Sequence, residues 1–267
     1  MRGCASRGPG ICARARVPME GHKYDAGFYE YINAGSLASA RVICPLVTGW
    51  LKPDSVLDVG CGAGAWCRVW GEAGVPDVQG TDGVYVDKRS LLIPEGSFHS
   101  QDLAQVFDFG RKFSLVTSLE VAEHIPESSA RIFVENLARH GSVILFSAAV
   151  PGQGGEFHVN EQPLGYWKEH FEALGFSCFD PVRPLVARSS NVEPWYRYNT
   201  LLYVRDDALS LLPNAVLESR VDGEPRELAP WTWRTRNAIL ASLPSPVLNF
   251  LVQVKHAWGR RFRPASR

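Results

Sequence analysis

The sequence predicts an α/β fold, in which helices cover both faces of a mostly parallel sheet. Short apolar stretches alternate with amphipathic helical stretches from residue 56 to residue 204, and this alternation is typical of parallel strands joined by crossover helices. Three glycines at alternating positions directly follow the first apolar stretch. With 267 residues, 45% of them hydrophobic, the chain is long enough to bury one substantial core.

Residues 1–20 are expected to form a disordered tail. Residues 1–18 are rich in Arg, Gly and Ala, contain no acidic residue, and lack the apolar centre of a secretory signal peptide. An organelle transit peptide is the alternative. Met19 is an alternative start, because the periodic pattern begins just after it.

The next segment, residues 21–51, is expected to hold lid helices. A helix is predicted over Ser36–Leu51, ending before Pro53. It follows a short helix or turn that carries a group of large apolar side chains, Tyr24, Phe28, Tyr29 and Ile32. These side chains either close the mouth of a cofactor site or cover an edge of the sheet.

Val56–Trp66 predicts a strand, a tight turn and the start of a helix. Gly60, Gly62 and Gly64 allow a sharp turn and a close ligand, because glycine has no Cβ. The helix that follows, Ala63–Ala73, directs its free N–H groups and the positive end of its dipole toward the turn. Such a turn suits a nucleotide-like cofactor.

Asp58 discriminates between two classes of cofactor. Gly60-x-Gly62-x-x-Ala65 also satisfies the dinucleotide fingerprint, which would indicate a nicotinamide dehydrogenase. A carboxylate at the turn would repel a pyrophosphate, but it suits a cofactor with a cationic amino-acid end. The sequence therefore favours the second kind of cofactor.

Two more acidic residues extend the expected cofactor site. Asp82 ends a second strand, Val78–Asp82, and lies 22 positions after Gly60, a spacing at which an acid reaches ribose hydroxyls. A carboxylate can accept two hydrogen bonds from a cis-diol. A third strand or loop, Phe98–Leu103, ends in Gln101-Asp102-Leu103, where a polar side chain and the backbone can contact an adenine amine.

The rest of the expected sheet continues the alternation. A long Gly-rich loop, Pro151–Gln162, follows the fifth strand, and a loop of this length inside a compact domain is usually functional. The remaining strands are expected at Phe113–Leu119, Val143–Phe146, Phe176–Phe179 and Tyr198–Val204, with helices at 128–140 and Leu164–Leu174.

These motifs, in this order, resemble those of class I S-adenosylmethionine-dependent methyltransferases. Residues 58–64 match Asp-x-Gly-x-Gly-x-Gly of motif I, and Asp82, Asp102 and Glu-x-x-Glu-His-Ile follow. The loop Pro-Gly-x-Gly-Gly…His-Val-Asn-Glu-Gln is similar to that of bacterial-type small-molecule and glycan methyltransferases. The resemblance covers residues 24–205. It implies a Rossmann-like sheet of seven strands with the last one antiparallel, S-adenosylmethionine as cofactor, and a methyltransferase domain over residues 21–205.

The expected site joins the motif residues to their neighbours. Its cofactor-binding members are Asp58, Gly60, Cys61, Gly62, Gly64, Asp82, Gly83, Gln101, Asp102, Leu103 and Ser118. The expected acceptor is an oxygen or nitrogen atom of a small molecule or glycan, which the sequence does not identify further.

Methyl transfer from a sulfonium is an in-line displacement, so the enzyme contributes chiefly by positioning. An oxygen or nitrogen acceptor must also lose a proton, which favours a histidine as base. His124 and His158 both lie at the expected C-terminal edge of the sheet, and Asn160 can orient an acceptor hydroxyl. The plainer alternatives are that His124 bonds to backbone and that His158 has no role.

A divalent metal is the alternative to a simple base. Glu120, Glu123 and His124 are expected on one helical face, because residues i, i+3 and i+4 share a face, and His158 can add a fourth ligand. Glu-x-x-Glu-His…His resembles the pattern of magnesium-dependent 2′-O-methyltransferases of small-RNA 3′ ends, and of ubiquinone-pathway O-methyltransferases that use a divalent ion. A hard cation would activate and orient a diol. The same Glu-His also occurs in methyltransferases without a metal, and the simple base is preferred.

Charge and cysteine content narrow the partners. The formal net charge is +0, and no basic excess indicates nucleic acid as a partner. The six cysteines show no C-x-x-C pair, so they are expected to be free thiols in a reducing cytoplasm. No apolar run reaches the roughly 18 residues that span a bilayer.

Residues 206–267 are expected to form a helical C-terminal extension. Helices are predicted over Ala208–Val216 and Trp231–Leu240. A last helix carries an apolar face followed by basic residues: Val247, Phe250, Leu251, Val254 and Trp258, then Lys255, Arg260, Arg261 and Arg263. This face either contacts an anionic membrane surface or packs on its own domain or a dimer mate.

A non-catalytic protein that keeps the cofactor fold is the alternative from another class. It would bind at the turn and transfer nothing. The intact glycine turn and both downstream acids favour an enzyme over this alternative.

Overall fold

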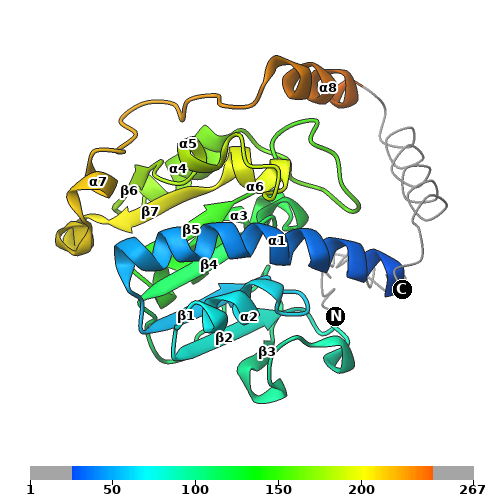
Figure 1. Cartoon of the computed structure of the whole chain (residues 1–267), viewed down its shortest axis with the longest axis vertical. Coiled ribbons are helices and arrows are strands. Elements are labelled where there is room, and N and C mark those ends of the chain that lie inside the picture. Colours follow the sequence, from blue (N-terminus) through cyan, green and yellow to red (C-terminus); the bar gives the residue numbers. More distant parts are fainter. Residues whose placement is uncertain (1–25, 243–267) are drawn as a thin grey trace, which may run out of the picture.

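The computed structural model describes residues 26–242, with side chains from residue 33 onward. Seven strands form one sheet in the order β3-β2-β1-β4-β5-β7-β6 (Figure 1). β1 to β5 are parallel, and β7 is antiparallel to both of its neighbours. The strands are β1 Ser55–Val59, β2 Asp77–Asp82, β3 Phe98–Ser100, β4 Leu115–Leu119, β5 Val143–Ser147, β6 Phe176–Phe179 and β7 Leu201–Arg205. The predicted seven-stranded, mostly parallel fold is confirmed.

Helices cover both faces of the sheet, which explains why the central strands are apolar along their whole length. All five residues of β1, β4 and β5 are buried. On one face, α1 and α2 pack into a core that includes Trp66 and Trp70. α3 and α4 cover the other face (Figure 1) and contribute Phe133 and Trp167 to its core. The helices are α1 Ala26–Leu51, α2 Ala65–Glu72, α3 Ala130–His140, α4 Leu164–Glu172, α5 Arg183–Val186, α6 Pro194–Asn199, α7 Asn214–Leu217 and α8 Trp231–Ala241.

α1 differs from the predicted short turn followed by a separate helix. It is one continuous helix from Ala26 to Leu51 with Pro45 inside it. Its inner face is fully buried through Ala40, Ile43 and Cys44, and Ser36 Oγ lies 3.1 Å from the hydroxyl of Tyr196. The C-terminal half of α1 is therefore a fixed layer of the core. Tyr24 and the tail over residues 1–20 lie outside the described residues.

Length and composition alone would allow α1 to cross a membrane over Asn33–Leu51, where the mean hydropathy is 1.2. This corrects the expectation that no such apolar segment exists. The buried inner face of the helix is also what a core helix of a globular domain shows.

The segment after β7 belongs to the same core as the sheet. Ala208, Leu212 and Val216 are buried with the residues of α1 and α2, and the Val221 amide donates to the Cys178 carbonyl at 2.9 Å. The expected boundary at residue 205 therefore divides a packed unit.

The predicted helix Ala208–Val216 is wrong in detail. A 3-10 turn, Asp206–Leu211, is followed by Pro213 and the single-turn α7, because proline cannot continue the first segment as a helix. Likewise Tyr198 and Asn199 belong to α6 rather than to a strand. α8 agrees with the predicted helix at Trp231–Leu240, whereas the basic amphipathic helix predicted after Pro246 lies outside the described residues.

Candidate functional site

The glycine turn joins β1 to α2 with three residues in the left-handed region. The φ angles of Gly60, Gly62 and Gly64 are +84°, +54° and +87°, which L side chains adopt only with strain. A Cβ on Gly60 would collide with Val121, and one on Gly64 would lie 3.0 Å from Ile93 Cγ1. A Cβ on Gly62 would meet no heavy atom of the described residues within 4 Å. Gly62 therefore faces the open space at the turn.

Asp58 lies within β1, two residues before the turn, and its carboxylate faces the protein interior. Its Oδ1 accepts a hydrogen bond from Thr117 Oγ1 at 2.6 Å, and Oδ2 lies 3.6 Å from the Cys67 thiol. Burial raises the pKa of Asp58 to about 6. Asp58 is thus hydrogen-bonded to the neighbouring strand β4. Any electrostatic effect of Asp58 on a cofactor would act without direct contact.

Asp82 ends β2 directly beside the turn. Its Oδ2 accepts from the Gly62 amide at 2.7 Å, and Oδ1 accepts from the Gly83 amide at 2.6 Å and the Tyr85 hydroxyl at 2.5 Å. Burial raises the pKa of this carboxyl above its ordinary value. Tyr85 is a site residue that sequence reasoning missed, since no motif marks it.

The remaining predicted cofactor residues lie around the same edge of the sheet. β3 ends at Ser100, so Gln101, Asp102 and Leu103 follow it in a turn. The Gln101 amide donates to the Asp82 carbonyl at 2.9 Å, and Asp102 Oδ1 accepts from the Ala104 amide at 3.0 Å. Ser118 in β4 is fully buried, and its hydroxyl has no partner among residues 33–242.

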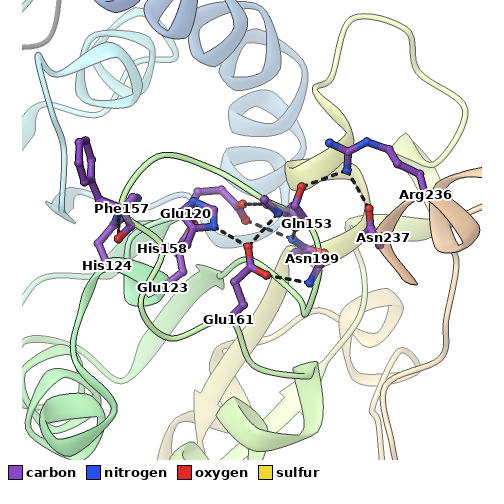
Figure 2. Close-up of polar contacts among 12 residues, drawn as sticks. Glu120, Glu123, His124, Gln153, Phe157, His158, Glu161, Asn199, Arg236 and Asn237 are labelled. Carbon is purple, nitrogen blue, oxygen red and sulfur yellow. Dashed lines mark hydrogen bonds and ion pairs between the residues drawn. The ribbon is translucent and has the colours of Figure 1, made fainter. Parts of the chain in front are cut away.

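The segment after β4 is not the helical turn that was expected. Glu120 has φ +58°, outside the helical region, and a 3-10 turn covers Ala122–His124. Glu120 therefore does not share a face with Glu123 and His124. Its carboxylate instead accepts hydrogen bonds from Gln153 Nε2 at 2.6 Å and Asn199 Nδ2 at 3.4 Å (Figure 2).

Glu161 organises the loop over residues 151–162. Its carboxylate accepts from the amides of Gly152 at 2.7 Å and Gly154 at 2.8 Å, and Oε1 lies 2.8 Å from His158 Nδ1 (Figure 2). Although burial opposes ionisation, the hydrogen bond from His158 and these amides lower the pKa of Glu161. Glu161 is ionised and fixes the orientation of His158. Sequence reasoning missed it as a site residue, although the spacing His-x-x-Glu could have indicated it.

The loop returns over the segment after β4 and brings three predicted residues together. The Glu123 carbonyl accepts from the amides of Val159 and Asn160 at 2.9 and 3.0 Å. The rings of His124 and His158 meet edge to face at 4.9 Å between centroids. One ligand atom each from Glu123, His124 and His158 lies within 4.8 Å of the others. Of the four predicted metal ligands, these three therefore lie close together and Glu120 does not.

Glu123 is the buried member of this cluster, whereas His124 is exposed and His158 is half-buried. The Glu123 side chain is 1% exposed, and burial together with Glu120 raises its pKa well above the ordinary value. Its Oε2 has no partner in the described part of the chain. Desolvation and the neighbouring His158 lower the pKa of His124, whose Nδ1 lies 3.3 Å from the Phe157 carbonyl.

Asn160 is more enclosed than expected for a residue that contacts an acceptor. It is 3% exposed, and its Oδ1 accepts from Gln162 Nε2 at 2.9 Å. Its Nδ2 has no partner among the described side chains and backbone groups. A ligand could reach that donor only after the loop shifts.

Comparison with known proteins matches this arrangement to one family. The sequence profile of a family described as a methyltransferase domain matches residues 39–181, which is more than half of the chain. No curated protein matches the sequence.

Solved structures share the fold at low identity. The sugar N-methyltransferase KedS8 from Streptoalloteichus is 18% identical with a TM-score of 0.53, over 73% of this chain and 99% of that chain. DesVI from Streptomyces venezuelae is 16% identical with a TM-score of 0.51, over 69% and 100%. CalS10 from Micromonospora, an amino pentose methyltransferase bound to S-adenosylmethionine, is 16% identical with a TM-score of 0.50, over 70% and 99%.

Proposed function

The chain belongs to the methyltransferase domain family, and from this we propose that it transfers a methyl group from S-adenosylmethionine to an oxygen or nitrogen of a small molecule or glycan. The observation that carries the proposal is the juxtaposition of Gly62 and Asp82. The Gly62 amide bonds the Asp82 carboxylate at 2.7 Å, and the space in front of Gly62 is open. Both residues lie at the C-terminal edge of the sheet, where α/β folds bind ligands.

The residues at this edge fit S-adenosylmethionine. Gly62 leaves room for a ligand at the turn, whereas Gly60 and Gly64 allow close packing against Val121 and Ile93. Asp82 offers carboxylate oxygens for a ribose diol. S-adenosylmethionine supplies a methyl group on a sulfonium, which is already activated for displacement. The contribution of this chain is then to hold the acceptor in line with that methyl group and to receive a proton.

His158 is proposed as the base that receives the proton. Glu161 accepts a hydrogen bond from Nδ1 at 2.8 Å, which leaves the lone pair on Nε2. An ionised carboxylate behind the ring also stabilises the imidazolium that forms. The His158 side chain is 12% exposed, so water reaches it poorly, and its Nε2 lies 3.9 Å from Glu123 Oε1.

A divalent cation at the same cluster is the second candidate, and one observation favours it. The buried Glu123 Oε2 has no partner within the described residues, as expected of a carboxylate that awaits a ligand. His124 and His158 both direct Nδ1 to an acceptor, Phe157 O and Glu161 Oε1, so Nε2 of each can bind a metal, and Nε2 of His158 lies 3.9 Å from Glu123 Oε1. Glu123, His124 and His158 would hold the ion, and its chemistry would be activation of an acceptor hydroxyl.

The domain limits and the location are proposed on similar grounds. We place the end of the cofactor-binding domain at residue 221, because Val216 is fully buried and Val221 bonds Cys178. The described cysteines, Cys44, Cys61, Cys67 and Cys178, are free and buried. Free thiols support a reducing cytoplasm as the location.

Thermal shift of the full chain with S-adenosylmethionine, S-adenosylhomocysteine and NAD tests the proposal. A ligand at 100 times its Kd stabilises the folded state by about 2.7 kcal/mol, so the first two should raise the melting temperature and NAD should not. Stabilisation by NAD alone would identify a dehydrogenase instead. Binding without methyl transfer to any acceptor, in a screen with labelled S-adenosylmethionine, would indicate the non-catalytic alternative.

A further inference from the structure

α8 is attached to the loop that carries His158, although the two residues that join them, Gln153 and Arg236, are 83 positions apart in sequence. Arg236 Nη1 donates to the Gln153 carbonyl at 3.0 Å and to Asn237 Oδ1 at 2.9 Å (Figure 2). The helix therefore binds the backbone of the loop through a charged donor, and such bonds are about twice as strong as neutral ones.

The backbones of the helix and the loop also touch. A Cβ on Gly152, which has φ +76°, would collide with the carbonyl oxygen of Asn237 and meet Ala241 Cβ at 2.9 Å. Asn237 is the buried residue of α8 in the described part of the chain. The loop thus requires glycine at position 152 for both its conformation and its contact with the helix.

Within the described part of the chain, little else holds α8 in place. The connection over residues 222–230 is largely exposed, and the helix leaves Trp231 75% and Ile239 57% exposed. Its apolar attachment to the domain is Trp233, whose ring lies 6.2 Å from that of Tyr198 and beneath the Arg236 guanidinium at 4.9 Å. A helix that buries so little apolar surface adds little to the core, so its contact with the loop is its main structural effect.

The loop residues that α8 binds are connected to the proposed base. Gln153 also bonds Glu120 at 2.6 Å and Asn199 at 2.8 Å through its side chain. The amides on either side of it, at Gly152 and Gly154, are held by Glu161, which in turn holds His158. A shift of the Gln153 backbone would therefore move the Glu161–His158 pair.

We propose that Arg236 is a positioning residue, through which α8 fixes residues 151–162 in the arrangement that orients His158. The proposal rests on the proposed role of His158. Arg236 acts through Gln153 and Glu161 and does not itself touch the acceptor site. α8 thereby becomes part of the acceptor side of the enzyme.

Hydrogen exchange of the full chain with bound S-adenosylhomocysteine tests the proposal. Arg236→Gln should speed exchange of the Gly152 and Gly154 amides by about tenfold or more, because a lost charge-assisted bond permits local opening. The nitrogen resonances of the His158 ring should shift in the same variant. Arg234→Gln, on an exposed position of the same helix, is the matched control and should change neither readout. Arg236→Lys should restore part of the protection.

Two further measurements keep the outcome interpretable. Arg236→Met keeps the side-chain stem over Trp233 and removes the donor, so it replaces Arg236→Gln if that variant melts early. Exchange and His158 resonances that match the control in both variants would overturn the proposal. Calorimetry of the wild-type chain with S-adenosylhomocysteine reports separately on the proposed function, and the Arg236 variants should keep that affinity within about twofold.

Discussion

Tyr85 donates its hydroxyl to Asp82 at 2.5 Å and so occupies a lone pair on the carboxylate that a ribose diol would use. The same Oδ1 accepts from the Gly83 amide at 2.6 Å. A bound ribose hydroxyl must therefore replace Tyr85 at Asp82 or share the oxygen with it. Tyr85 and Asp82 should then affect cofactor affinity in opposite directions.

We expect Asp82→Ala to weaken S-adenosylmethionine binding by about 1.5–3 kcal/mol, which is the loss of a charge-assisted hydrogen bond. Tyr85→Phe should tighten binding by about 0.5–1.5 kcal/mol, because it removes the competing donor. Calorimetry with both variants and with Tyr166→Phe, a control on α4, measures these effects. Weaker binding by Tyr85→Phe would mean that the tyrosine assists the cofactor and does not compete with it.

Gly62→Val should abolish cofactor binding by filling the space at the turn. Gly110 provides a matched control, because it has φ +67° and its Cβ would also meet nothing within 4 Å in the described structure. Both valine variants should lose about 1–2 kcal/mol of stability from left-handed strain, but Gly110→Val should keep its affinity. Calorimetry combined with urea unfolding separates strain from exclusion, and equal loss of binding in both variants would contradict the prediction.

Asp58 should make the protein less stable as the pH rises. Its pKa is raised from 3.8 to about 6 by burial, so between these values the folded state binds more protons than the unfolded state. The contribution of Asp58 to the free energy of unfolding is then fully present below pH 4 and is lost as the pH rises through 6. The loss is about 3 kcal/mol at 1.36 kcal/mol per pKa unit.

Asp58→Asn removes this titration and provides the measurement. The difference between the unfolding free energies of wild type and variant should change by about this amount from pH 4 to pH 7 and then level off. A constant difference across that range would show that Asp58 is ionised in the folded protein.

A chain that ends at residue 221 should fold, and one that ends at Arg205 should not. The shorter chain loses Leu212 and Val216 from the core, and fully burying such a side chain is worth about 1.5–3 kcal/mol. That loss is a large fraction of a typical stability of about 5–15 kcal/mol. Circular dichroism melts compare the two chains. A cooperative melt of the chain that ends at Arg205 would show that the domain ends at residue 205, as the sequence predicted.

The sequence was most informative where local chemistry decides structure. The turn at Gly60–Gly64 and the acid at the end of β2 depend on residues near in sequence, so spacing alone located them. Glu120 was misassigned because i, i+3 spacing presumes a helix, whereas its φ of +58° places it before one. Contacts such as Arg236 to Gln153 join distant segments, and a single sequence carries no periodic signal for them.

The base mechanism and the metal mechanism assign different roles to Glu123, His124 and His158, so mutations can distinguish them. If His158 is a simple base, His158→Ala should lower turnover by about 10²–10⁴ with S-adenosylmethionine affinity unchanged, and Glu161→Gln should lower it less. His170→Ala, on α4, is the control for loss of an imidazole. Turnover is measured with an acceptor found by a labelled-methyl screen.

Chelation decides between the two, because a base needs no ion. We expect turnover to survive dialysis against EDTA, and Mn²⁺ titrated into the apo protein to give no bound EPR spectrum. If EDTA abolishes turnover and Mg²⁺ or Mn²⁺ restores it, Glu123 becomes the informative residue. Glu123→Gln keeps the buried shape of the side chain but removes its charge, so it should then abolish ion binding, whereas a base mechanism should tolerate it. Since the pKa of Glu123 is raised well above its ordinary value, a neutral glutamine is the closer mimic of the metal-free carboxyl.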